Sequence, residues 1–178
     1  MKYFLLGAFA SAFFIFGAAL LYGFSGSLRL SDIAAAVSGG TPVLGQEGLL
    51  LLGATMVAAG LLFKVGAAPF HIWTPDVYQG APTPVTGFMA ACTKVAAFGA
   101  LLRVVYVALP GTRWDLTPAL WGVTILTMVV GSVIAIVQTD VKRMLAYSSI
   151  AHAGFLLTGL LAMDRAGVSG VLFYLFAY

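Results

Sequence analysis

The sequence predicts an all-α protein, a polytopic bundle of transmembrane helices that forms one membrane domain over residues 1–178. Hydrophobic residues make up 61% of the chain and charged residues only 8%, whereas soluble domains have about 45–50% apolar and about 25% charged residues. The apolar residues also gather in runs of about 20, the length that crosses the roughly 30 Å hydrocarbon core of a bilayer. The lipid bilayer is therefore the expected environment.

Apolar runs long enough for complete spans cover residues 3–24, 48–73, 85–108, 118–138 and 144–163. A sixth run starts near residue 168 and stops at Tyr178, about half of the length that a span needs, so we expect a partial domain with a truncated last helix. A signal peptide is the alternative for the first run, but its apolar stretch of about 20 residues exceeds the usual core of a signal.

The connections between the runs are short. Residues 25–47 hold turn residues around the segment 31–37 (SDIAAAV), for which we predict a short interfacial helix capped by Ser31. Positive charge orients the bundle only weakly. We place Lys2 and the adjacent Lys142–Arg143 pair on the cytoplasmic side, which leaves the other loop arginines outside: Arg29, Arg113 and Arg165.

Composition also excludes several function classes. The formal net charge is +3, and Lys142–Arg143 is the one adjacent basic pair, so the chain lacks the basic stripe of a nucleic-acid-binding protein. Cys92 is the single cysteine; it allows neither an internal disulfide nor a cysteine-based metal site. We expect no metal and no nucleic acid.

Lys64 lies where the helix of the second run is expected to break. An unbroken helix would carry it about 16 residues, or roughly 24 Å, into its span, where a lysine can snorkel to the interface. However, Gly66 and Pro69 follow, and a proline removes a backbone donor and disfavours helical geometry at the residue before it. We predict a discontinuous helix near residues 64–68, with Lys64 on a hydrated path beside the opened backbone.

Lys94 is predicted at the middle of the membrane. It lies about nine residues, or roughly 14 Å, from one end of its helix, and a centred lysine costs at least about 2.5 kcal/mol to insert. It should therefore face the bundle interior and have a function. Arg103, nearer a helix end, is explained by snorkelling.

The two histidines are candidates for proton transfer. His71 follows the predicted break, and His152 follows a cluster of hydroxyl side chains, Tyr147, Ser148 and Ser149. Imidazole exchanges protons near neutral pH, and a stripe of hydroxyls can order a water chain that leads to it. The alternative for each histidine is a hydrogen-bonded packing role.

The expected partner of a proton-carrying lysine is missing from the chain. Burial disfavours the ammonium form and a carboxylate favours it, so a carboxylate that approaches and withdraws would load and release a proton. The acidic residues all fall at predicted span ends or in loops: Asp32, Glu47, Asp76, Asp115, Asp140 and Asp164. We expect the partner of Lys94 to lie outside this chain.

Three segments carry a resemblance to a known family. Residues 61–90 (LLFKVGAAPFHIWTPDVYQGAPTPVTGFMA), 92–99 (CTKVAAFG) and 138–155 (QTDVKRMLAYSSIAHAGF) are similar to the antiporter-like membrane subunits of proton-pumping NADH–quinone oxidoreductase, respiratory complex I. The form PDVYQGAPTPV is most similar to the family's subunit N. The likeness covers essentially the whole chain.

The resemblance implies that this chain carries a proton path and that partner subunits carry the redox cofactors. It places Lys64 at a helix break, Lys94 mid-membrane, and His71 and His152 along the hydrated axis. It implies a translocase subunit in a bacterial plasma (inner) membrane, in contact with other membrane subunits of complex I. NAD, FMN and iron–sulfur clusters then belong to partner subunits and quinone is the substrate of the complex. This chain has no dinucleotide fingerprint or cysteine cluster of its own.

Two alternatives stay open. A subunit of a cation/proton antiporter or of a membrane-bound hydrogenase would share the lysine at the helix break and the DVKR-like turn. A structural membrane-arm subunit would hold the same lysines in fixed ion pairs without transport.

Overall fold

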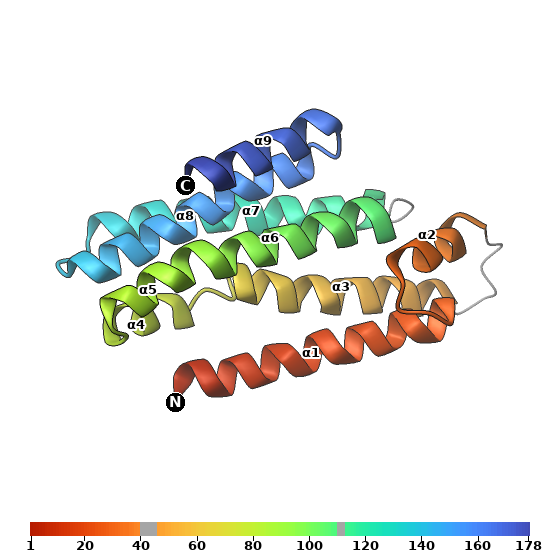
Figure 1. Ribbon diagram of the computed structural model, residues 1–178, viewed down its shortest axis with the longest axis horizontal. Helices are drawn as coiled ribbons and strands as arrows, with labels where there is room; N and C mark the ends of the chain where they lie inside the picture. Colours follow the sequence, from red (N-terminus) through yellow and green to blue (C-terminus); the bar gives the residue numbers. More distant parts are fainter. Residues whose placement is uncertain (40–45, 110–112) are drawn as a thin grey trace.

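Helices and short connections make up the described part of the chain. A computed structural model describes residues 1–39, 46–109 and 113–178, and it contains no strand within these ranges. The long helices run side by side along the longest axis (Figure 1). Their bounds are α1 (Lys2–Ser25), α3 (Gln46–Val65), α7 (Arg113–Ile136), α8 (Val141–Leu161) and a composite helix of α5 (Thr83–Phe88), η1 (Met89–Thr93), α6 (Lys94–Arg103) and η2 (Val104–Ala108). The shorter helices are α2 (Leu30–Gly39), α4 (Trp73–Gly80) and α9 (Arg165–Ala177).

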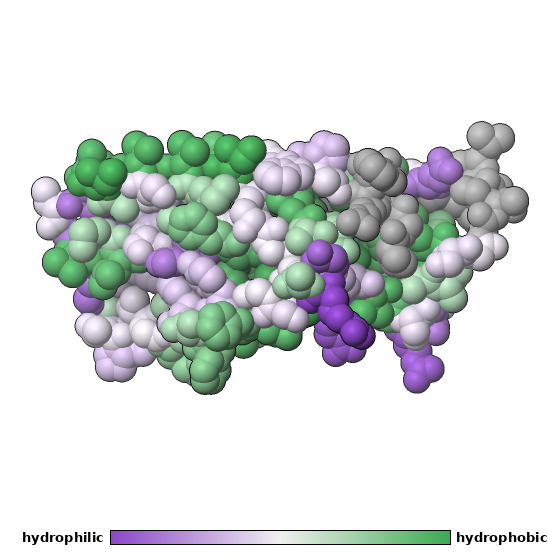
Figure 2. Space-filling model, turned by 90° about the horizontal axis from the view of Figure 1, so that it is seen from above, coloured by the Kyte–Doolittle hydropathy of each residue, from purple (hydrophilic) through white to green (hydrophobic). Residues whose placement is uncertain are grey.

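The predicted all-α membrane bundle is confirmed. Within the described residues, 5 helices are long and apolar enough to cross a membrane: Lys2–Ser25, Glu47–Val65, Thr83–Ala108, Leu116–Ile136 and Val141–Leu161. Broad apolar areas lie along the molecular surface in Figure 2, as lipid contact requires. The sixth predicted run forms α9. The helix of the second run ends at Val65, within the break predicted near residues 64–68.

Two π-helical segments, η1 and η2, interrupt the third span. A π-turn inserts an extra residue into the helix and often marks a functional site. Within η1 the Thr93 hydroxyl donates to the carbonyl of Met89. Lys94 begins the α-helix directly after this wider turn, so the direction of its side chain depends on it. Sequence periodicity did not predict either segment.

Glycines allow α1 and α3 to pack at backbone distance. A Cβ atom on Gly17 would lie 2.8 Å from the Gly53 carbonyl oxygen, and one on Gly53 would lie 3.0 Å from the Gly17 carbonyl oxygen. Small residues commonly bring transmembrane helices together in this way. The α1–α3 pair therefore gives the helix break a fixed support.

The predicted discontinuity after Lys64 is confirmed. Gly66 has φ 78°, in the left-handed region that glycine adopts without strain. The N–H of Ala67 donates to the Leu62 carbonyl and that of Gly66 to the Phe63 carbonyl, which is the hydrogen-bond pattern of a Schellman C-cap. Helical structure resumes only at Trp73, the first residue of α4.

Side chains bind the backbone groups that the break exposes. The buried N–H of Ala68, which precedes a cis peptide bond to Pro69, donates to Thr127 Oγ1 on α7 at 3.0 Å. The indole N–H of Trp73 donates to the Phe63 carbonyl at 3.0 Å. Irregular backbone at membrane depth is tolerated only with such partners or with water, so α7 and α4 make the break possible.

A charged cluster closes the end of the bundle at which α4 lies. The Asp76 carboxylate on α4 accepts from Lys2 Nζ at 2.6 Å and from Arg143 at 2.8 Å. Lys142 Nζ donates to the Ala81 carbonyl at 3.2 Å. The basic residues that we placed on one side of the membrane thus lie at the same end of the bundle.

The short helix predicted between the first two spans forms as α2, but the predicted cap at Ser31 is wrong. The helix already begins at Leu30, so Ser31 lies in its first turn. The Ser27 hydroxyl, in the turn before the helix, accepts from the Arg29 N–H and donates to Asp32. Residues 40–45 of this connection, and residues 110–112, lie outside the described residues.

We expect Thr127→Val to destabilise the protein by about 1–3 kcal/mol, since the buried Ala68 N–H loses its acceptor. Thr124→Val is a matched control, because Thr124 is equally buried and its hydroxyl bonds only the Leu120 carbonyl of its own helix. The measurement is the free energy of unfolding in detergent micelles. Equal effects of the two substitutions would contradict the role of Thr127 at the break.

The charged cluster predicts a pH dependence of stability. Hydrogen bonds from Lys2 and then Arg143 hold the pKa of Asp76 below its usual value of 3.8. A lowered pKa stabilises the fold fully above the unfolded-state pKa and loses this effect as pH falls through the folded-state pKa. Thermal unfolding between pH 7 and pH 3 should therefore show a smaller acid destabilisation in Asp76→Asn than in the parent. Glu47→Gln, in the first turn of α3 and away from this cluster, should show the same acid destabilisation as the parent.

Candidate functional site

Lys94 lies inside the bundle, as the sequence predicted. It belongs to the third candidate span, and only 3% of the residue is exposed. Its α6 neighbours Ala97, Phe98 and Leu101 are buried in the main hydrophobic core. The ammonium group therefore needs polar partners within the protein.

A serine and an aromatic ring surround the Lys94 ammonium. Nζ donates to Ser149 Oγ at 2.6 Å and also to the Ser149 carbonyl oxygen. The ring of Tyr178 lies 4.9 Å from Nζ, measured to the ring centroid, which is within the range of a cation–π contact. Three helices, α6, α8 and α9, thus meet at this charge.

The partners of Lys94 are neutral. Both salt bridges found among the described residues use Asp76, at the end of the bundle. Hydroxyl, carbonyl and π groups stabilise the ammonium through dipoles and a quadrupole rather than through a full opposite charge. The described part of the chain therefore provides a place for the charge but no carboxylate for it.

His152 shares one aromatic neighbour with Lys94. Its ring centroid lies 5.1 Å from that of Tyr178, and its Nδ1 is 2.6 Å from the Tyr174 hydroxyl. A cavity of 360 Å³ is lined by His152, Tyr174, Ala177 and Tyr178. Lys94 and His152 thus both lie close to the ring of Tyr178, with space for water beside the imidazole.

Tyr78 approaches the same serine from α4. It is buried, and burial raises the pKa of its phenol to about 12, although a hydrogen bond with Ser149 acts in the opposite direction. The phenol therefore stays neutral at physiological pH, able both to donate and to accept a hydrogen bond.

His71 lies in the broken segment, half-buried, with its ring 6.4 Å from that of Tyr147. Its Nδ1 and the Oγ1 of Thr74 are buried and have no hydrogen-bond partner among the described residues. The structure places His71 near the hydroxyl cluster of α8 but in no direct contact with Lys94.

Lys64 is separate from this cluster. Its side chain is exposed and, within the described residues, makes no hydrogen bond or ion pair. It borders a cavity of 280 Å³ between α1 and α3, together with Ser11 and Phe14. The structure does not bring the two predicted lysines together.

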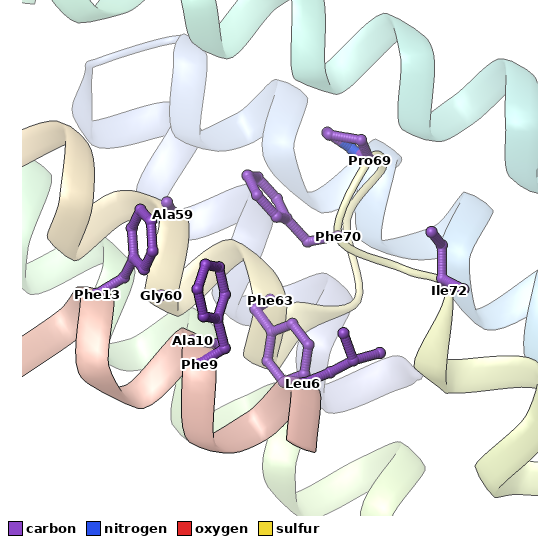
Figure 3. Close-up of a pocket in the computed structure, with 10 residues that line it drawn as sticks. All are labelled: Leu6, Phe9, Ala10, Phe13, Ala59, Gly60, Phe63, Pro69, Phe70 and Ile72. Atoms are coloured by element: carbon purple, nitrogen blue, oxygen red, sulfur yellow. The ribbon is translucent and has the colours of Figure 1, made fainter. Parts of the chain in front are cut away.

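An apolar cavity of 320 Å³ lies beside the break. Figure 3 shows Phe9 and Phe13 from α1 and Phe63 from α3 around it, with Phe70 and Ile72 from the segment that joins α3 to α4. Its lining side chains carry no protonable group. This cavity packs the break and offers nothing to a proton.

Sequence reasoning missed the partners of the charged groups. Ser149 belonged to the predicted hydroxyl cluster, but nothing singled it out from Ser148. Tyr174 on α9 and Tyr178, the C-cap residue of that helix, are four residues apart, and this spacing places them on one helix face. That spacing was a usable signal.

No group of three or more His, Cys, Asp or Glu side chains that could hold a metal occurs in the described ranges.

Comparisons with known proteins agree with these features. The chain is 67% identical over its full length to NADH-quinone oxidoreductase subunit N of Beutenbergia cavernae and spans 33% of that protein. It is similar to a chain of respiratory complex I from Thermus thermophilus, with 47% identity and a TM-score of 0.76 over 99% of this chain and 37% of that one. A chain of the Mrp complex from Dietzia shares the fold, with 23% identity and a TM-score of 0.85 over 97% of this chain and 31% of that one.

The length comparison shows that the chain spans about a third of the relatives that it matches. The family model for the transmembrane region of NADH:quinone oxidoreductases and Mrp antiporters matches residues 1–178. Because that match includes the broken helix, Lys94 and the α8 hydroxyl cluster, the chain belongs to the NADH:quinone oxidoreductase/Mrp antiporter transmembrane family.

Proposed function

We propose that this chain is the lysine-bearing part of a proton-translocating membrane-arm subunit of NADH–quinone oxidoreductase, equivalent to subunit N. It would lie in a bacterial plasma membrane against other membrane subunits of the complex. NAD, FMN and iron–sulfur clusters would be bound by partner subunits, which reduce quinone. The identity of 67% to a subunit N across the whole chain supports this assignment.

The observation that carries the proposal is the burial of Lys94 in a membrane span without a carboxylate partner among the described residues. A lysine used only for structure would be expected in a fixed ion pair or at the lipid interface. Neutral dipoles hold the ammonium less strongly than a carboxylate does, so a modest change around it can release the proton. Lys94 is thus suited to carry a proton.

The other predicted residues take supporting roles in this proposal. His152 lines a cavity together with Tyr178 and would exchange protons with water there. Lys64 and His71 flank the helix break and would serve the part of the path nearest α3. Neither contacts Lys94, so transfer between them and Lys94 would require intervening water or protein from the remaining two thirds of the subunit.

The antiporter alternative receives less support. The family includes Mrp antiporters, and the fold likeness to the Mrp complex is close, but the identity there is only 23%. The identity to subunit N is far higher over the same residues. A structural subunit without transport remains the alternative that an experiment on Lys94 must separate.

In the assembled complex, Lys94→Ala should lower proton pumping at least about tenfold, since groups that transfer protons commonly contribute 10²- to 10⁴-fold. Lys94→Arg should restore little, because a guanidinium keeps its proton at any physiological pH. The measurements are proton uptake and quinone reduction in sealed vesicles. Arg103→Gln, on the same helix and exposed, is the control and should pump normally.

Pumping and turnover near the parental level in an assembled Lys94→Ala complex would remove Lys94 from the proton path. The structural alternative would then be favoured.

A further inference from the structure

Ser149 is the point at which the interior polar groups converge. It is 3% exposed and lies on α8 between Ala146 and Ala153, which are fully buried. These small neighbours let adjacent helices approach α8 closely. The serine hydroxyl is therefore within reach of groups from several elements.

Two side chains from different helices meet the Ser149 hydroxyl. Lys94 Nζ donates to Oγ at 2.6 Å, and the Tyr178 hydroxyl donates to Oγ at 2.9 Å. A serine oxygen has two lone pairs and one proton. Its two acceptor positions can thus serve these two donors.

Tyr178 connects Ser149 to the cavity beside His152. It is the C-cap residue of α9 and lines that cavity together with His152. The ionisable groups around Ser149 and Lys94 are Tyr178, His152 from α8 and Tyr78 from α4. The exposed side chain of Lys64 on α3 lies apart from them.

We propose that Ser149 is the positioning residue for the proton carrier Lys94: its hydroxyl holds the ammonium form in place and links it to the cavity beside His152 through Tyr178. This inference rests on the proposed function. Ser149 holds Lys94 with two oxygen atoms, so loss of the hydroxyl leaves the carbonyl contact intact. The expected effect is a changed proton affinity rather than a lost carrier.

The test compares Ser149→Ala and Ser149→Thr in the assembled complex, with the pH profile of proton pumping as the readout. Without the hydroxyl the ammonium form loses one acceptor, so the alkaline pH at which pumping falls to half should drop by about one unit. Threonine retains the hydroxyl and should restore the parental profile. Thr158→Ala, an exposed hydroxyl on the same helix that bonds only Phe155, should leave the profile unchanged.

A Ser149→Ala profile that overlaps the parental one would overturn the inference, as would a shift that threonine does not reverse. Should the alanine variant fail to assemble, Ser149→Cys replaces it: a thiol is a weaker acceptor of similar size, and the half-point should move in the same direction by a smaller amount. An unshifted cysteine profile also overturns the inference. Failure of the proposed function is recognised separately, because Lys94→Ala would then pump normally.

Discussion

This structure depends on one constraint: each backbone N–H and C=O group inside the bilayer needs a hydrogen-bond partner. An α-helix meets it internally, and any interruption has to be compensated by other parts of the protein. The interruption at Gly66 is compensated by its own cap, by Thr127 from α7 and by Trp73 from α4. Those contacts fix where α4 lies, and Asp76 on α4 in turn binds Lys2 of α1 and Arg143 of α8. The helix that carries Ser149 is thus held in part by the segment that follows the break.

A similar constraint applies to the ammonium charge of Lys94. Transfer of an ammonium group from water to the membrane interior is expensive, and a permanent carboxylate partner would offset much of that penalty while holding the proton firmly. Lys94 instead has a hydroxyl, a carbonyl and an aromatic face. Under the proposed function, this arrangement would accommodate both protonation states, which a carrier requires and a purely structural lysine does not.

The sequence predicted the structure best at residue types that are unusual inside a transmembrane helix. Apolar length predicted the spans, the glycine and proline after Lys64 predicted the break, and the central position of Lys94 predicted its burial. The partners could not be predicted, because Ser149 lies 55 residues from Lys94 along the chain and nothing in the sequence separates it from the adjacent Ser148. The π-turns were also missed, since one extra residue in a turn leaves no mark on an evenly apolar run. Exposure of Lys64 depends on which neighbour lies against α3, and an apolar pattern does not specify that neighbour.

One consequence follows from the spacing of two tyrosines on α9. Tyr174 and Tyr178 lie on the same face of the helix, one beside His152 and the other over Lys94. Any rotation or withdrawal of α9 must therefore detach both rings together. The imidazole would lose its phenol partner at the moment when the ammonium loses its aromatic cover. A single movement of α9 would therefore expose the imidazole of His152 and the ammonium of Lys94 at the same time.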